Sequence, residues 1–238
     1  MPHPAPAHPA PGWIAALPRH RLMGEFSMWS ADLTGLAADT VRIEPHADML
    51  HIDVADGHFA PAFLFFPDLV ARIRALTAVP IHVHLMCADA VLLSQIEQFA
   101  ESGADLISIH VENAAVADAA LERIKALGLA AGMVLRIETP VAQVAPWLDR
   151  LDCLTLLGTA IGVKGQGLDP TAPARLREAA AKIVKTGRRI VLAADGGIRD
   201  NTVPLLRAAG AETVVLGSLA FGAPDLAERM RWLHGLQA

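Results

Sequence analysis

Eight short apolar segments alternate with eight amphipathic segments along most of this 238-residue chain, and this repeat limits the possible folds more than any other feature. The apolar segments have the length of buried strands, which we predict over 25–30, 48–54, 79–86, 105–112, 130–137, 152–158, 189–195 and 213–218. The segments between them repeat apolar residues at i, i+3 and i+4, which predicts helices over 32–44, 67–77, 89–102, 115–127, 140–149, 171–186, 200–209 and 223–236.

Eight strand–helix units without a break in composition predict an α/β architecture, a closed (β/α)8 TIM barrel in a single domain. The alternative is an open doubly wound sheet, in which a glycine-rich dinucleotide fingerprint follows the first strand. The residues at that point are instead Ser27, Met28, Trp29 and Ser30. The barrel is therefore the predicted fold, and catalytic residues are expected at the C-terminal ends of its strands.

The composition argues against several classes of partner and site. Hydrophobic residues make up 53% of the chain and charged residues 19%, so a large core can be buried. A net charge of -5 gives no basic footprint, and nucleic acid is not expected as a partner. No apolar run reaches the roughly 18 residues of a membrane span. Two cysteines, Cys87 and Cys153, indicate a reducing cytoplasm rather than a disulfide framework.

The first 21 residues differ in composition from the rest of the chain. Residues 1–12 are rich in Pro, Ala and His, and they lack the charged start and apolar stretch of a signal peptide. We predict a flexible tail over 1–21 and the catalytic barrel over 22–238. Exposed apolar residues on the outside of a barrel commonly lie in subunit contacts, so we expect a homo-oligomer.

Three predicted strands carry polar side chains where buried strands are normally apolar. His51 and Asp53 lie on one strand, His84 on the next, and Asp195 ends the seventh. Side chains alternate between the two faces of a strand, so His51 and Asp53 point the same way. Two imidazoles and two carboxylates around one cavity are costly to bury unless a cation or a reaction compensates. This donor set suits one divalent ion of zinc, iron, manganese or cobalt.

Such a site predicts enzyme chemistry. A divalent ion could polarise a substrate carbonyl and stabilise an enediolate. Asp53 and Asp195, which lie on different strands, could act as acid and base on opposite sides of a substrate carbon. The alternative is structural, with the histidines hydrogen-bonded in the core and the aspartates capping the following helices. The occurrence of all four residues at matching strand ends favours the metal site.

Glycine-rich loops follow the sixth, seventh and eighth predicted strands. The loops after the seventh and eighth strands of a barrel commonly bind phosphate through backbone N–H groups, and glycine lets the backbone approach without a Cβ. The loop after the sixth strand could close over a ligand. The alternative is that these are ordinary turn glycines. The candidate residues are Gly162, Val163, Lys164, Gly165, Gly196, Gly197, Ile198, Gly217 and Ser218.

From about residue 26 to 222 the chain resembles the ribulose-phosphate 3-epimerase family. The resemblance rests on Phe26-Ser27-Met28-Trp29-Ser30-Ala31-Asp32-Leu33, His51-Ile52-Asp53-Val54-Ala55-Asp56-Gly57-His58-Phe59, Val83-His84-Leu85-Met86, Thr139-Pro140, Asp195-Gly196-Gly197 and Gly217-Ser218-Leu219-Ala220-Phe221. It implies a ribulose-phosphate-binding TIM barrel and an isomerase of carbohydrate metabolism. Such an enzyme is metal-dependent and epimerises C3 of a ketose phosphate, such as a pentose phosphate, through an enediolate.

The resemblance also implies roles for single residues. The matching metal ligands are His51, Asp53, His84 and Asp195, and the two aspartates would be the proton-transfer pair. Ser27 would contact the substrate near its carbonyl, and His84 would also lie against it. Met86 would line the site. The phosphate would be held by Gly197, Gly217 and Ser218, together with the loop after the sixth strand.

The walls of the predicted site depart from the family pattern. Ala55 replaces a methionine, Ala62 follows Pro61 where the family has an asparagine, and Arg136 replaces an asparagine. The family's Asn-Pro-Gly-Phe-Gly-Gly-Gln lid reads Ala160-Ile161-Gly162-Val163-Lys164-Gly165-Gln166. We therefore hypothesise a ketose phosphate other than ribulose 5-phosphate, either another pentulose or a hexulose or tetrulose phosphate. The alternative for Arg136 is an ion pair with Glu138.

Two other functions fit the same barrel. One is a phosphosugar lyase or decarboxylase, because a barrel fold does not fix the reaction. The other is a non-catalytic sugar-phosphate-binding barrel whose altered loops have lost turnover. The intact set of four polar strand-end residues argues against the second.

Overall fold

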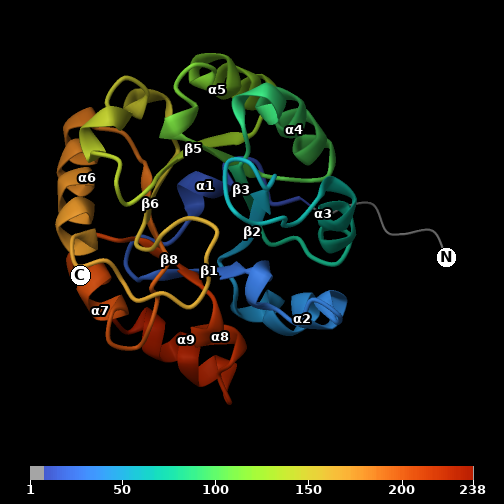
Figure 1. Cartoon of the computed structure of the whole chain (residues 1–238). Helices are drawn as coiled ribbons and strands as arrows, with labels where there is room; N and C mark the ends of the chain where they lie inside the picture. The colour runs from blue at the N-terminus through green and yellow to red at the C-terminus, as the bar shows by residue number, and fades with distance from the viewer. Residues whose placement is uncertain (1–7, 238) are drawn as a thin grey trace.

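The computed structural model describes residues 8–237, in which eight parallel strands pair in sequence order and close into a barrel (Figure 1). The predicted (β/α)8 barrel is confirmed. The strands are β1 Met23–Ser27, β2 Met49–Ala55, β3 Ile81–Met86, β4 Leu106–His110, β5 Ala130–Leu135, β6 Cys153–Leu157, β7 Val191–Asp195 and β8 Thr213–Leu216.

Helices surround the strands (Figure 1). Each long helix buries one apolar stripe, as in α4, where Leu92, Ile96 and Phe99 are fully buried. No helix within residues 8–237 is both long enough and apolar enough to span a membrane. The α-helices after β1 are α2 Leu36–Ile43, α3 Pro67–Arg74, α4 Asp89–Glu101, α5 Ala117–Ala126, α6 Ala172–Thr186, α7 Val203–Ala208, α8 Ser218–Phe221 and α9 Leu226–His234.

One predicted helix is replaced by tighter turns. Instead of an α-helix over 140–149 the chain forms two 3-10 helices, η4 Val141–Val144 and η5 Leu148–Arg150. Pro146 lies between them, and a proline inside a helix lacks the N–H donor and clashes with the carbonyl four residues earlier. The other short 3-10 helices are η1 Met28–Ser30, η2 Glu44–His46 and η3 Val111–Asn113.

The first strand–helix unit also differs from its prediction. The strand predicted over 25–30 ends at Ser27, where η1 begins, and it starts earlier, at Met23. Helix α2 begins at Leu36 and not at residue 32. The Asp32 carboxylate instead accepts hydrogen bonds from the N–H and Oγ1 of Thr34, which forms a local turn before the helix. Glu25 therefore lies in the middle of β1 and not at its start.

Alternate residues of each strand point into the barrel and form three layers. The lowest layer is apolar and includes Met23, Met49, Leu106, Cys153 and Val191. The layer above contains polar residues linked by hydrogen bonds, among them Glu25, His51, His82 and Ser108. The upper layer contains Ser27, Asp53, His84, His110 and Asp195 and borders the C-terminal ends of the strands. The register sets Ser27 beside His51 and Asp53 beside His84.

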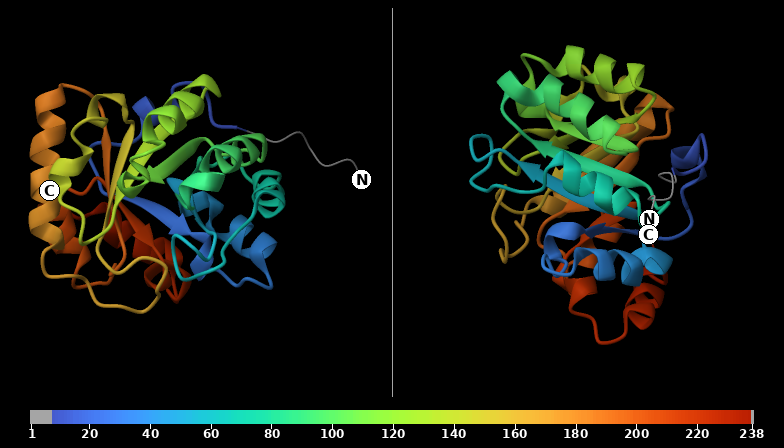
Figure 2. Two further views of the ribbon diagram at one scale, coloured as in Figure 1. Left: turned by 45° about the horizontal axis from the view of Figure 1, so that its top comes forward. Right: turned by 90° about the vertical axis from the view of Figure 1, so that its right-hand side faces the viewer.

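The chain before β1 contacts the lower end of the barrel. A single-turn helix, α1 Trp13–Ala16, precedes Leu17, and the side chains of Trp13, Ile14 and Leu17 pack on the lowest interior layer. In the right-hand view of Figure 2, α1 lies at the end opposite to the loops that follow β2 and β6. The flexible tail was expected over 1–21. Residues 1–7 lie outside the described part of the chain, whereas residues 13–17 pack against the barrel.

Candidate active site

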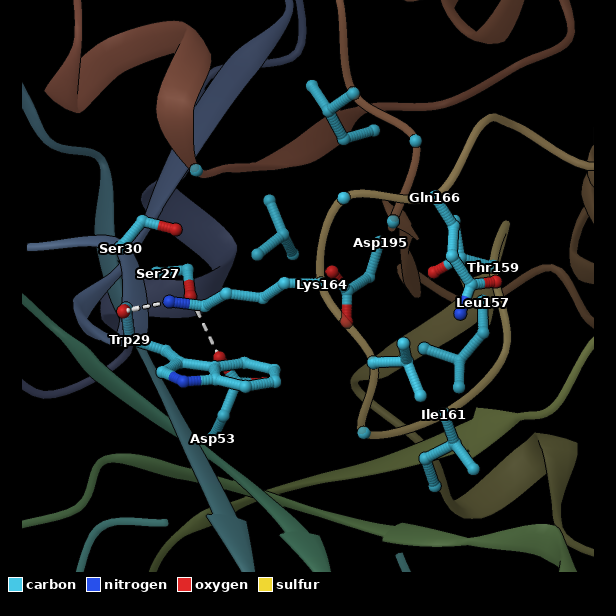
Figure 3. Close-up of a pocket in the computed structure, with 18 of the residues that line it drawn as sticks. Ser27, Trp29, Ser30, Asp53, Leu157, Thr159, Ile161, Lys164, Gln166 and Asp195 are labelled. Carbon is cyan, nitrogen blue, oxygen red and sulfur yellow. Dashed lines mark hydrogen bonds between the residues drawn. The ribbon is translucent and has the colours of Figure 1, made fainter. Parts of the chain in front are cut away.

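A pocket of about 410 Å³ opens at the C-terminal ends of the strands (Figure 3). It is bordered by the ends of β1, β2, β3 and β7, by the loops after β6 and β7, and by the start of α8. Almost all the predicted site residues line it. Those residues are Ser27, Asp53, His84, Met86, Gly162, Val163, Lys164, Gly165, Asp195, Gly196, Gly197, Ile198, Gly217 and Ser218.

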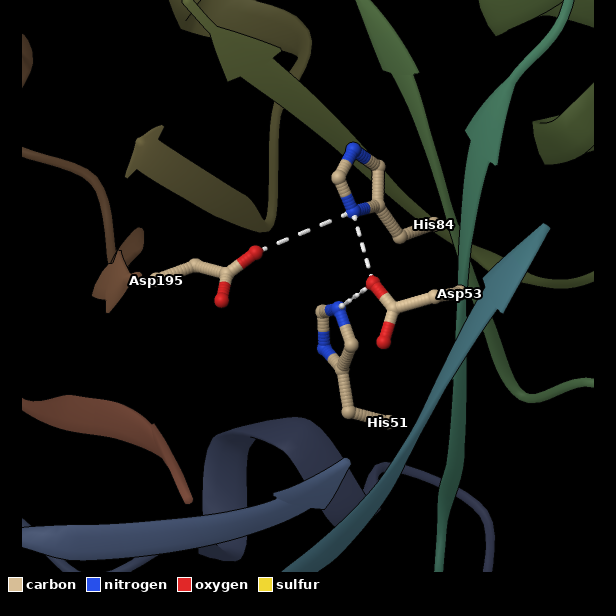
Figure 4. Close-up of side chains that lie close together, drawn as sticks. All are labelled: His51, Asp53, His84 and Asp195. Atoms are coloured by element: carbon tan, nitrogen blue, oxygen red, sulfur yellow. Dashed lines mark ion pairs between the residues drawn. The ribbon is translucent and has the colours of Figure 1, made fainter. Parts of the chain in front are cut away.

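The four predicted metal ligands converge at the floor of this pocket. One ligand atom from each of His51, Asp53, His84 and Asp195 lies within 4.8 Å of the others. Asp53 Oδ1 is 3.3 Å from His51 Nε2 and 3.4 Å from His84 Nδ1, and His84 Nδ1 is 3.9 Å from Asp195 Oδ2 (Figure 4). Three different strands therefore deliver four donors to one point, as the alternation of side chains predicts.

The donors fit a divalent cation. His51 Nε2 and His84 Nδ1 are buried, and neither makes a hydrogen bond with any residue of the described chain. A buried polar atom without a partner is costly, and both of these atoms face carboxylate oxygens in the cluster. A cation bound between two imidazole nitrogens and two carboxylates would compensate all four groups.

The two aspartates of the cluster have different acidities. Burial would raise the pKa of Asp53, but the adjacent His51 and His84 hold its pKa well below the ordinary range. Burial raises the pKa of Asp195 to about 6, and the Asp53 carboxylate adds to that rise while His51 and His84 oppose it. Two carboxyl groups whose pKa values are driven apart are typical of a pair that works as acid and base.

Ser27 and Met86 complete the wall around the cluster. Ser27 ends β1, and its Oγ donates a hydrogen bond of 2.8 Å to Asp53 Oδ2, which orients that carboxylate. Met86 ends β3 and is 2% exposed, packed with Ala55 and Ala60. Ala55 occupies the position where the resemblance leads us to expect a methionine, so Met86 packs beside a small side chain on the adjacent strand.

The loop after β7 depends on two glycines. Gly196 and Gly197 have φ angles of 89° and 70°, in the left-handed region where other residues are strained. A Cβ on Gly197 would lie 2.7 Å from the Cα of Leu168, and one on Gly196 would lie 2.3 Å from Oγ1 of Thr159. Only glycine therefore allows this loop to pack against the β6 loop beside the pocket.

The loop after β6 covers part of the pocket. Lys164 reaches across the mouth, where its Nζ donates a 2.5 Å hydrogen bond to the carbonyl oxygen of Trp29 and lies 4.5 Å from the centre of the Trp29 ring. Gly162 approaches the β2–α3 loop so closely that a Cβ would lie 2.9 Å from Pro61 Cδ. The predicted lid thus contacts both the segment after β1 and the β2–α3 loop, and Figure 3 shows the first of these contacts, from Lys164 to Trp29.

Arg136 lies apart from these residues. It is not among the residues that line the pocket. Its guanidinium donates a hydrogen bond to the carbonyl oxygen of Phe59 and lies 4.2 Å from the centre of the Phe59 ring. The Phe59 ring in turn contacts His110. Arg136 therefore tethers the β2–α3 loop, and its expected part in substrate specificity stays a prediction.

Two further residues, His110 and Glu112, support the cluster through His84. His84 Nε2 lies 2.8 Å from His110 Nε2, and His110 Nδ1 lies 3.0 Å from Glu112 Oε2. Burial lowers the pKa of His110 to about 4, so its ring is neutral, and its Nδ1–H donates to the carboxylate. His110 Nε2 then accepts from His84 Nε2–H, which leaves His84 Nδ1 free to bind a cation.

Sequence reasoning missed several residues at this site. Thr159 and Arg199 line the pocket but belong to no motif, and Trp29 and Ser30 belong to the motif that starts at Phe26 but were given no role. Glu25 lies beneath the cluster, where it is fully buried against His51. Glu25 and Ser27 stand at i and i+2 of the strand predicted over 25–30, so the alternation of side chains could have placed both on the interior face.

Sequence comparisons give consistent matches. Residues 25–221 match the family described as the ribulose-phosphate 3 epimerase family. Ribulose-phosphate 3-epimerase 1 of Cupriavidus necator is 37% identical over 204 residues, which cover 84% of this chain and 84% of the relative. Ribulose-phosphate 3-epimerase of Bacillus subtilis is 33% identical over 211 residues, 88% of this chain and 96% of the relative.

Solved structures share the barrel at much lower identity. KGPDC from Streptococcus mutans superposes with a TM-score of 0.66 and 15% sequence identity, covering 90% of this chain and 99% of that one. Likeness at this level of identity concerns the fold alone.

Proposed function

The chain belongs to the ribulose-phosphate 3-epimerase family, and on that basis we propose that it is a metal-dependent isomerase that epimerises C3 of a ketose phosphate. The observation that carries the proposal is the convergence of His51, Asp53, His84 and Asp195 on one point of the pocket floor. Curated relatives over most of the chain are named epimerases, which favours this reaction over the lyase and non-catalytic alternatives.

The proposed metal site consists of His51 Nε2, His84 Nδ1 and one carboxylate oxygen each from Asp53 and Asp195. A bound divalent ion would polarise the ketose carbonyl and offset the charge of an enediolate. Ser27 supports this arrangement because its hydroxyl fixes one oxygen of Asp53 and leaves the other toward the histidines. Zinc, iron, manganese and cobalt all suit this donor set.

The proposed proton transfer uses the two aspartates. They reach the cluster from β2 and β7, on opposite sides of the view in Figure 4. Asp53 would remove the C3 proton on one face of the substrate, and Asp195 would return a proton on the other face. The roles would exchange in the reverse direction. Their opposite pKa shifts support this assignment, because one group is kept ionised and the other holds its proton to higher pH.

The phosphate is proposed to bind at the loops after β7 and β8. Gly197, Gly217 and Ser218 line that side of the pocket, and their backbone N–H groups are suitable donors to phosphate oxygens. The lid residues Gly162, Val163, Lys164 and Gly165 would close over the ligand.

The identity of the ketose is a separate hypothesis. The family supports a pentulose phosphate as the substrate class, and we propose that the changed lid selects a ketose phosphate other than ribulose 5-phosphate. Lys164 carries this part of the proposal, because it brings a positive charge to the pocket mouth, whereas Arg136 lies away from the pocket.

The test is an NMR screen of pentulose, hexulose and tetrulose phosphates in deuterated water, with zinc-, manganese- or cobalt-loaded protein. We expect deuterium to enter at C3 with retention of the carbon skeleton. Loss of a carbon atom from the substrate, or cleavage of its carbon chain, would support the lyase or decarboxylase instead. The absence of deuterium exchange with any ketose phosphate would support the non-catalytic barrel. A clear preference for ribulose 5-phosphate would refute only the hypothesis of a different substrate.

We also propose a homo-oligomer that acts in the cytoplasm. Both cysteines are free and buried, as suits a reducing compartment. Phe63 and Phe66 are 85% and 59% exposed on the loop between β2 and α3, and a subunit contact would bury them. Light scattering of the purified chain tests the assembly, and a monomer at all concentrations would contradict it.

A further inference from the structure

The interior layer beneath the proposed metal site is polar, which is unusual for this architecture. Bulky aliphatic side chains normally fill the inside of such barrels. Here Glu25, His51, His82 and Ser108 are each 0% exposed and form one hydrogen-bonded chain. Burying a carboxylate and two imidazoles away from solvent is costly, so this layer is expected to serve the site above it.

Glu25 is the centre of that chain. Its Oε2 lies 3.0 Å from Nδ1 of His51 and 2.7 Å from Nδ1 of His82. One carboxylate oxygen within hydrogen-bond distance of two imidazole nitrogens has the geometry of an ionised carboxylate that accepts from both rings. An ionised carboxylate can only accept hydrogen bonds, and both Nδ1 atoms therefore carry protons.

This arrangement decides which nitrogen of His51 can bind a cation. With Nδ1–H committed to Glu25, only Nε2 can offer a lone pair, and Nε2 is the atom that faces Asp53 at 3.3 Å. Without the Glu25 acceptor, the ring proton would favour Nε2, where the Asp53 carboxylate can accept it. The ligand atom would then be blocked.

His82 and Ser108 hold Glu25 in place. Because His82 Nδ1 donates to Glu25, its Nε2 accepts from the Ser108 hydroxyl at 2.7 Å. The neighbouring strand leaves room for that hydroxyl, since a Cβ on Gly132 would lie 2.0 Å from Ser108 Oγ. The Glu25 carboxylate is therefore held by His82 as well as by His51.

We propose that Glu25 is a positioning residue that selects the cation-binding tautomer of His51, so that metal affinity depends on a carboxylate in the layer of His51, below the other three ligands. This inference rests on the proposed metal site. Carboxylates that accept from the second nitrogen of a ligand histidine typically contribute 10- to 100-fold to metal affinity. Glu25 does not touch the pocket, so its effect would pass through His51.

A different reading makes Glu25 a ligand itself, because Glu25, His51 and His82 also offer three donor atoms within 4.8 Å of one another. The distances of 2.7 and 3.0 Å are those of hydrogen bonds, and one carboxylate oxygen already accepts both. We therefore assign a supporting role, and the number of ions bound per chain separates the two readings.

The experiment measures zinc affinity by chelator competition on the full-length, metal-stripped protein, with metal analysis for stoichiometry. Glu25→Gln keeps an acceptor and loses the charge, and we expect about 10-fold weaker binding. Glu25→Met also removes the acceptor, and we expect about 100-fold weaker binding. The control is Thr155→Val, which alters another fully buried polar residue, on β6, and its affinity should be unchanged.

Circular dichroism would confirm that each variant is folded, and ¹⁵N NMR of the zinc-loaded protein would locate the His51 proton at Nδ1. Glu25 variants that bind zinc within twofold of the wild type would overturn this inference and leave the proposed function intact. Two ions per wild-type chain would also overturn it, because Glu25 would then be a ligand. A wild-type chain that binds no zinc would overturn the proposed metal chemistry and this inference together.

Discussion

The two sides of the barrel mouth are built from different parts of the chain. On the β1–β4 side the functional groups are side chains of the strands themselves, and His51, Asp53 and His84 are 0–6% exposed. Asp195, at the end of β7, belongs with these strand side chains, but the rest of the β6–β8 side of the pocket is lined mainly by loop residues and glycines, and lid residue Val163 is 46% exposed. The first side is held by a hydrogen-bonded interior, whereas the second depends on backbone conformation and contacts between loops.

This difference separates chemistry from recognition. Side chains fixed in the barrel interior cannot shift without disturbing the packed layers around them, so they suit a metal site and proton transfer. Loops tolerate substitution more readily, and the departures from the family pattern in residues 160–166 fall on the loop side. Changes on the strand side should therefore lower kcat, and changes on the loop side should raise KM.

The largest effect is expected from Asp53→Asn. The amide keeps the shape of the side chain but cannot accept the C3 proton, and kcat should fall on the order of 10³-fold or more. The measurement is deuterium entry at C3 of the best ketose phosphate, with circular dichroism as a check of folding. Asp152→Asn, at the opposite end of the barrel, is the matched control and should keep its activity. Near-normal exchange in Asp53→Asn would refute the two-aspartate scheme.

The pair His51 and Asp53 shows what could be predicted from the sequence on the strand side. Strict alternation places both on the interior face, and strand ends in a barrel share one edge, so the four-residue cluster followed from pattern alone. Glu25 was missed because its role depends on which residues of β1, β2 and β3 meet inside the barrel. That register is a tertiary property and leaves no local signal.

The loop side was less predictable. The glycine pairs indicated tight turns, but the contact between Lys164 and Trp29 joins residues that are 135 positions apart. Arg136 was considered for substrate specificity because it replaces a family asparagine at the end of the fifth strand, and nothing in the sequence indicated that it stacks on Phe59. Loop conformations are decided by contacts between loops, which neither periodicity nor spacing encodes.

The second prediction concerns the stability of metal-free protein. The pKa of Asp195 is about 6 in the fold and 3.8 ordinarily, so folding favours the protonated form. That stabilisation is present below about pH 4 and is lost as the pH rises through 6. Asp195→Asn lacks this titration, so the unfolding free energy of the variant should rise relative to that of the wild type by about 2 kcal/mol between pH 4 and pH 7.

Urea denaturation in the presence of a chelator measures this difference. The titration of Asp53 does not interfere with this measurement. Folding lowers the pKa of Asp53, so the stability that its ionised form contributes is lost only as the pH falls below its ordinary pKa of 3.8. A constant difference between the two proteins across this range would mean that Asp195 is ionised throughout, and the contrast between the two aspartates would be wrong.

The third prediction tests the loop side through its backbone. Gly197→Ala introduces both a strained φ of 70° and a clash with Leu168, so the β7 loop must move. We expect KM to rise about 10- to 100-fold with a smaller change in kcat, since backbone donors to the phosphate are displaced. Gly128→Ala is the control, because its φ is 78° but nothing lies within 4 Å of the added Cβ. An unchanged KM in Gly197→Ala would remove this loop from the phosphate site.

The smallest effect is expected from Lys164→Met, which keeps the length of the side chain but removes its charge. The variant loses the hydrogen bond to the Trp29 carbonyl and the contact with the indole face, each of which holds the lid across the mouth. Interactions of this kind are worth about 1 kcal/mol when partly exposed, so KM should rise about fivefold while kcat is retained. Lys182→Met, on the exterior of α6 beside Glu178, is the matched control. A fall in kcat with KM unchanged would mean that Lys164 takes part in the reaction itself. That result would contradict the assignment of the chemistry to strand residues and of substrate recognition to loop residues.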